Sequence, residues 1–129
     1  MITEQIHNSL KHAAQDLILA EIELNRPHED VVTLSACQSV RTSMKKMMHL
    51  YLTANDINNH DKMSIEELMT ACISANESFS GIDISNIECK GMAHEKCEGK
   101  YCLSIENVSC CLAATKELKD IVWFELKVK

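Results

Sequence analysis

Apolar residues recur every three or four positions along most of this chain, which is the spacing of one face of an α-helix. The first such stripe runs from Ile2 to about Asn25 and is followed by Pro27, which disfavours helix in the residue before it. An amphipathic helix is therefore expected over residues 2–25. Its inward positions are Ile6, Leu10, Ala13, Leu17 and Leu24, with Ala14 and Ile18 widening the stripe.

A second helix is expected to begin near Glu29 and Asp30, because their carboxylates suit the positive end of a helix dipole. It should end before the polar run 55–61, which breaks the period and is interpreted as a loop. The three methionines of this helix are interpreted as adaptable core side chains. Its inward positions are Val31, Leu34, Cys37, Val40, Met44, Met47, Met48 and Tyr51.

Two further helices are expected in the second half of the chain. Ser64 and Glu67 have the spacing of a capping box, so a short helix should begin there and end between residues 76 and 79. The last helix should run from about Ser104 to Leu126. The inward positions of the two helices are Ile65, Leu68, Met69, Cys72 and Ile73, and then Val108, Cys111, Leu112, Thr115, Leu118, Ile121, Val122 and Trp123.

These elements predict an all-α fold, an antiparallel up-and-down bundle of four to five helices that forms one domain over residues 1–129. The composition agrees with this fold class. The chain is 46% hydrophobic and 25% charged, as globular domains are, and its three Gly and one Pro are few for a sheet-rich fold with many tight turns.

Charge and cysteine content narrow the setting in which the protein is expected to work. The start of the chain lacks the pattern of a secretion signal, and no apolar run is long enough to span a membrane, so a cytoplasmic location is expected. The seven cysteines are odd in number and include the adjacent Cys110 and Cys111, which favours reduced thiols. A net charge of −6 opposes general binding to phosphate backbones.

An irregular segment at about residues 80–102 interrupts the helical pattern and is long for a connection in so small a domain. It contains Cys89, His94, Cys97 and Cys102, and three thiols with one imidazole are donors that suit tetrahedral zinc. A bound metal would order such a loop, but the tight Cys-x-x-Cys spacing is absent. The alternative is that Cys102 is a small buried residue at the start of the last helix and the other three side chains have no shared role.

Catalytic motifs of the common hydrolases and nucleotide-binding enzymes are missing from the chain. The sequence has no Gly-x-Ser-x-Gly, no phosphate-binding glycine loop and no His-Glu-x-x-His. The remaining candidates are Arg41, Lys45 and His49, in steps of four along the expected second helix. Imidazole exchanges protons near neutral pH and guanidinium stabilises phosphate charge. The alternative is that His49 is a structural residue on a helix face.

From Ala13 onward the order of features resembles the higher-eukaryote and prokaryote nucleotide-binding domain family, HEPN. The segments that carry the resemblance are 14–21 and 36–52, followed by His60 and Asp61, Leu68 and Cys72. The second of these segments has the small-residue start, the central polar cluster, the Lys-rich turn and the closing Tyr-Leu that are typical of helix two in that family.

This resemblance implies a bundle of four or five helices, a homodimer, and a small nucleotidyltransferase as a possible partner, with a nucleotide or RNA as ligand. Some members of the family are toxin ribonucleases of toxin–antitoxin pairs, in which an Arg is followed after four to six residues by a His. Here seven residues separate Arg41 from His49 and one separates Arg26 from His28, so neither pair has that spacing.

Three functions are therefore expected, in a definite order. The leading expectation is a HEPN-type module that binds a nucleotide or a partner protein. The first alternative is a toxin-like ribonuclease with a degenerate site at Arg41, Lys45 and His49. The second alternative is an interaction module ordered by zinc at Cys89, His94, Cys97 and Cys102.

Overall fold

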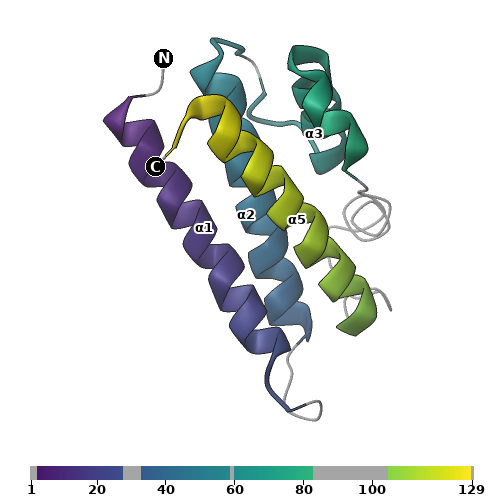
Figure 1. Cartoon of the computed structure of the whole chain (residues 1–129). Coiled ribbons are helices and arrows are strands. Elements are labelled where there is room, and N and C mark those ends of the chain that lie inside the picture. Colours follow the sequence, from purple (N-terminus) through teal and green to yellow (C-terminus); the bar gives the residue numbers. More distant parts are fainter. Residues whose placement is uncertain (1–2, 28–32, 59, 83–104, 129) are drawn as a thin grey trace.

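The computed structural model contains three long helices that lie side by side and a shorter fourth helix beside them (Figure 1). It describes residues 3–27, 33–58, 60–82 and 105–128. Those ranges contain no strand, which confirms the predicted all-α bundle. None of their helices is both long and apolar enough to cross a bilayer. The elements are α1 (Glu4–Leu24), α2 (Thr33–Ala54), α3 (Ile65–Ala75), the 3-10 helix η2 (Glu77–Gly81) and α5 (Ile105–Leu126).

Local hydrogen bonds explain where the helices begin and end. The Thr3 hydroxyl accepts from the Ile6 amide at 3.1 Å at the start of α1. The predicted capping box is confirmed at α3, because the Glu67 amide donates to Ser64 Oγ at 3.1 Å and the Ser64 amide donates to Glu67 Oε1 at 2.9 Å. The predicted start of the second helix, at Glu29 and Asp30, lies outside the described residues.

The short helix η2 was not predicted from the sequence. It follows α3 after Asn76, whose side chain accepts from the Ser78 amide at 2.9 Å and so caps the new helix. The turn places Phe79 in the core, where its ring meets the ring of Tyr51 edge-on at 4.8 Å. Only the first residues of the irregular segment 80–102 fall within the described ranges, and of these Ile82 is buried.

Two of the three long helices run opposite to the first (Figure 1). Helix α2 returns antiparallel along α1, and α5 also runs antiparallel to α1, with Lys116 in an ion pair with Glu21 (Figure 1). Helices α2 and α5 therefore run in the same direction while both pack on α1. The end of α5 lies near the start of α1 in Figure 1.

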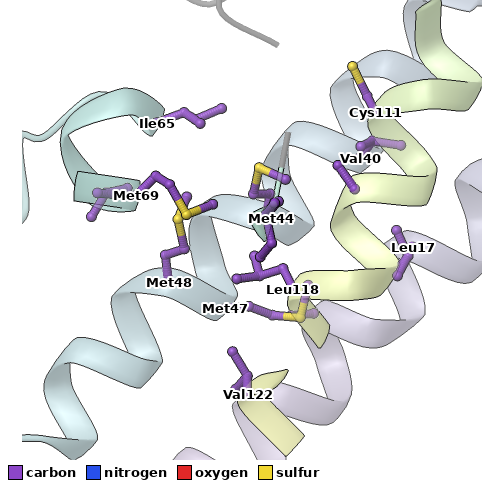
Figure 2. Close-up of a cluster of buried hydrophobic side chains, with 14 of the residues drawn as sticks. Leu17, Val40, Met44, Met47, Met48, Ile65, Met69, Cys111, Leu118 and Val122 are labelled. Carbon is purple, nitrogen blue, oxygen red and sulfur yellow. The ribbon is translucent and has the colours of Figure 1, made fainter. Parts of the chain in front are cut away.

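All of the described helices contribute to one hydrophobic core. Met44, Met47 and Met48 have no exposed surface, which confirms that the methionines of the second helix fill the core. In Figure 2, Met48 points toward Met69 of α3 and Met47 points toward Leu118 of α5. The flexible thioether side chains thus fill the space where α2 meets helices on two sides.

One expectation about α1 is wrong. Ile18 was predicted to widen the buried stripe, but it is 54% exposed. Successive residues of a helix are separated by about 100° around its axis. Leu17 and Ala20 face the core, and Ile18 therefore lies beyond the edge that α2 and α5 cover. Ala14, the other residue placed at that edge, is half-buried.

A buried hydroxyl marks the close contact between α1 and α2. Ser43 is completely buried, and its Oγ donates to the main-chain oxygen of Ala13 at 2.7 Å. Both side chains are small, so the two helix backbones can approach closely at this point. Nearby, the Lys46 ammonium lies 3.0 Å from the Asp16 carboxylate and joins the same two helices at the surface.

We expect Ser43→Leu to lower the free energy of unfolding by about 2 kcal/mol, because a larger side chain has to be accommodated between two tightly packed helices. Ser43→Ala should cost about 1 kcal/mol, since it removes one hydrogen bond and leaves the packing intact. The neighbouring Thr42 is exposed, so Thr42→Leu is the matched control and should change stability little. Urea denaturation followed by circular dichroism measures all three; equal losses for the two leucine variants would contradict the close contact.

Candidate functional site

The three catalytic candidates lie on one side of α2 without forming a cluster of their own. Arg41, Lys45 and His49 are each half-buried and are separated by four residues along the helix. With a rise of 1.5 Å per residue, the Cα atoms of Arg41 and His49 are about 12 Å apart along the axis. The partner that His49 meets at close range comes from another part of the chain.

That partner is His60, in the connection between α2 and α3. The Nδ1 atoms of the two imidazoles are 2.6 Å apart, and the ring centroids are 4.8 Å apart at an interplanar angle of 34°. His60 is only 7% exposed, and its Nε2 lies 3.3 Å from the hydroxyl of Thr53. The predicted loop at 55–61 therefore includes a buried polar residue that is hydrogen-bonded to α2.

The contact between the two Nδ1 atoms fixes the protonation of both rings together, because one nitrogen has to donate and the other has to accept. If His60 donates, the Thr53 hydroxyl donates to Nε2 of His60, and a neutral His49 carries its proton on Nε2. If His49 donates, His60 bonds to Thr53 through an Nε2 proton, and Nε2 of His49 is an acceptor. The ring of His49 can thus offer either a donor or an acceptor at Nε2 while remaining neutral.

The environment of His49 favours the neutral ring. Burial lowers the pKa of His49 from its ordinary value of 6.5, and the nearby His60 and Lys45 lower it further, while Asp61 acts in the opposite direction. Protonation of both rings at once would place one N–H against another at the Nδ1 contact, so the contact is compatible with at most one charged ring. His49 therefore has the protonation state of a general base or a neutral hydrogen-bonding group near pH 7.

His49 also lines an open hollow of about 330 Å³ between α1 and α2. Ser9 and His12 of α1 form one side, and Lys46, His49 and Leu50 of α2 form the other. None of these described lining residues is a carboxylate, although acidic residues outnumber basic ones in the chain by 19 to 13. Arg41 and Lys45 are not among them. We call this site the α1–α2 hollow.

A second surface feature lies on α1. Ile18, Leu19 and Ile22 are 54%, 59% and 59% exposed, and we call these three residues the α1 apolar surface. Ile18 also lines a smaller hollow of about 210 Å³ between α1 and α5, where Glu21 pairs with Lys116. An exposed aromatic side chain, Phe124, lies on α5.

The predicted zinc ligands Cys89, His94, Cys97 and Cys102 lie outside the described residues. Within the described ranges no group of three or more His, Cys, Asp or Glu side chains has the arrangement of a metal site. Cys37, Cys72, Cys110 and Cys111 are not joined in disulfides. Burial raises the pKa of Cys72 to about 12, so this thiol stays protonated and unreactive.

No protein-family model, curated protein or solved structure matches this chain. The HEPN resemblance therefore remains a hypothesis that the sequence pattern carries. The features of the described residues that bear on function are the imidazole pair, the α1–α2 hollow and the α1 apolar surface.

The sequence identified His49 but not its neighbours. His60 was placed in a loop because it lies within a polar run, and nothing in that run distinguishes a buried imidazole from an exposed one. Ser9 and His12 are more than thirty positions before the second helix residues that they face, so helix periodicity could not pair them with Lys46 and Leu50. The only sequence signal was the presence of several histidines in a small chain.

We expect the folded protein to lose stability as the pH falls from 7.5 to 5.5, and His49→Gln to reduce this loss. Because the pKa of His49 is lowered from 6.5 in the folded state, the unfolded chain binds more protons than the folded protein as the pH falls through this range. Urea denaturation at several pH values measures the slope. The exposed His12 provides the control, and His12→Gln should keep the slope of the wild type; an unchanged slope in His49→Gln would contradict the expectation.

Proposed function

We propose that this chain is a HEPN-like helical module that acts by binding, and that it forms a homodimer through the α1 apolar surface. The observation that supports this most directly is the exposure of Ile18, Leu19 and Ile22 on two successive turns of one helix. Most large aliphatic side chains in the described ranges are buried or half-buried. Contiguous apolar surface of this kind is typical of interaction sites.

Burial of the α1 apolar surface against a partner is energetically favourable. Fully burying a Leu or Ile side chain contributes about 1.5–3 kcal/mol relative to leaving it in water, and three such side chains lie together here. Ile22 lies four residues after Ile18 and three after Leu19, so it adjoins both on the helix surface, and a single helix of a partner can contact all three. The adjacent hollow between α1 and α5 offers space for a partner's side chain.

A second copy of the chain is the partner that this surface fits. In a two-fold contact, the same apolar patch is covered on both subunits without a further component. The resemblance supports the same proposal, because HEPN-like modules frequently form homodimers and often act with a small nucleotidyltransferase. The ligand that the resemblance implies is a nucleotide.

Native mass spectrometry of the tag-free protein should show a dimer, and the double variant Ile18→Lys with Ile22→Lys should shift the mass to that of a monomer. The two lysines replace apolar contacts by like charges at the proposed interface. A matched control is Thr70→Lys with Ser74→Lys, which places two lysines with the same four-residue spacing on the exposed side of α3. A monomeric wild type, or an equal effect of the control pair, would contradict the homodimer.

A ribonuclease is the second candidate, and one observation favours it. The neutral imidazole of His49 lines an open hollow together with His12 and Lys46, and such groups can remove a proton from a ribose hydroxyl and stabilise phosphate charge. Arg41 and Lys45 do not line this hollow. A ribonuclease site here would therefore combine His49 with His12 and Lys46, in place of the Arg41 and Lys45 expected from the sequence.

The binding proposal predicts that the purified protein leaves a labelled RNA uncut and that His49→Ala gives the same result. Cleavage by the wild type that is lost in His49→Ala would instead establish the ribonuclease. His7→Ala is the control, because His7 lies on α1 and is not among the residues that line the α1–α2 hollow. It distinguishes loss of a catalytic imidazole from removal of a contaminating nuclease during purification.

A further inference from the structure

The α1–α2 hollow differs in charge from the rest of the molecule. The chain carries a net charge of −6. The described residues that line this hollow nevertheless contribute the hydroxyl of Ser9, the imidazoles of His12 and His49, the ammonium of Lys46 and the side chain of Leu50. Because a binding site of this size needs only a few converging polar groups, this set is enough to orient a small ligand. All of its polar members can donate a hydrogen bond.

The imidazole pair gives His49 a defined role in this hollow. Nδ1 of His49 is engaged by His60, so Nε2 is the ring atom that remains for a ligand. In the arrangement where Thr53 donates to His60 and His60 donates to His49, the proton of His49 is on Nε2. A ligand that accepts a hydrogen bond therefore stabilises this arrangement of protons, and one that donates stabilises the other.

The ammonium of Lys46 can also serve a ligand. It lies 3.0 Å from Asp16, and the side chains of this pair are 49% and 27% exposed. An exposed ion pair of this kind is weak, because water screens the charges and both side chains lose freedom. Lys46 can therefore be shared with, or transferred to, an anion that enters the hollow.

We propose that the α1–α2 hollow binds a phosphate monoester, with the Lys46 ammonium, the His12 ring and Nε2 of His49 contacting the phosphate oxygens. Charge-assisted hydrogen bonds to phosphate are the strong contacts of such a site. Leu50 supplies an apolar contact for the organic part of the ligand, and Ser9 supplies a hydroxyl. A small monoester such as a mononucleotide fits this combination better than a bare anion.

This inference develops the nucleotide-binding part of the proposed function, but it uses different residues from the α1 apolar surface. The dimer can therefore fail without affecting the phosphate site, and the phosphate site can fail without affecting the dimer. Variants of Asp16 and Lys46 are expected to change the affinity for phosphate in opposite directions. Removing Lys46 removes a contact, whereas neutralising Asp16 releases Lys46 and removes a repelling charge.

The test is a titration of the ¹⁵N-labelled full chain with adenosine 5′-monophosphate, followed by NMR at constant pH and ionic strength. We expect the largest shifts at the amides of Ser9, His12, Lys46, His49 and Leu50. Lys46→Met should weaken binding about tenfold, the size expected for one charge-assisted hydrogen bond, and Asp16→Asn should strengthen it. The control Lys62→Met removes an exposed lysine in the connection between α2 and α3 and should leave binding unchanged.

Inorganic phosphate is the second probe and should shift the same amides with weaker affinity. Equal affinity for the two probes would overturn the monoester as the ligand, because the organic part would then contribute nothing. The proposal as a whole fails if adenosine 5′-monophosphate causes no shifts at the hollow, or if Lys46→Met and Lys62→Met weaken binding equally. Weaker binding in Asp16→Asn would overturn the role assigned to Lys46.

Discussion

The contact between Ser43 and Ala13 is the constraint on which the surface features of this bundle depend. Two small side chains let α1 and α2 approach closely. The buried hydroxyl of Ser43 donates a hydrogen bond to the main-chain oxygen of Ala13, so it is not left unpaired in the core. Around this contact, Ser9 and Leu50 line one hollow and Asp16 pairs with Lys46 across the same two antiparallel helices. The α1–α2 hollow is thus a consequence of helix packing, not of a local motif.

The pair formed by His49 and His60 adds a second constraint, between α2 and the connection that follows it. Burying His60 would be unfavourable if its ring nitrogens had no partners, but Thr53 and His49 supply both. The pair holds the connection between α2 and α3 against the helix, and His60 adds to the burial that lowers the pKa of His49. His49 therefore stabilises the fold through Nδ1, and the same contact determines whether its Nε2 donates or accepts a hydrogen bond.

Two surfaces of α1 suggest that binding is divided between different parts of one helix. The polar residues Ser9 and His12 face the hollow shared with α2, whereas Ile18 lies toward α5 and is exposed together with Leu19 and Ile22. The first surface has hydrogen-bond donors that suit the proposed anionic ligand, and the second has the apolar side chains that suit the proposed protein partner.

The sequence by itself determined the all-α class, the core positions of α2 from Cys37 to Tyr51 and the start of α3. Helix periodicity and the capping box are local properties, in which the relevant residues lie within one or two turns of each other. It also singled out His49, as a proton-exchanging side chain in a chain with few motifs. Ile18 was misplaced because periodicity gives the direction of a stripe but not the width that neighbouring helices cover.

Only the tertiary structure decided which residues meet across helices. His60 is next to His49 because the connection folds back on α2, and Ser9 and His12 meet Lys46 because α1 and α2 align in one register. Helix α5 pairs with α1 through Lys116 and Glu21, a contact between residues 95 positions apart that no local pattern specifies. These relations depend on how whole helices pack, and the packing free energy is summed over the entire core, so no short stretch of the sequence contains them.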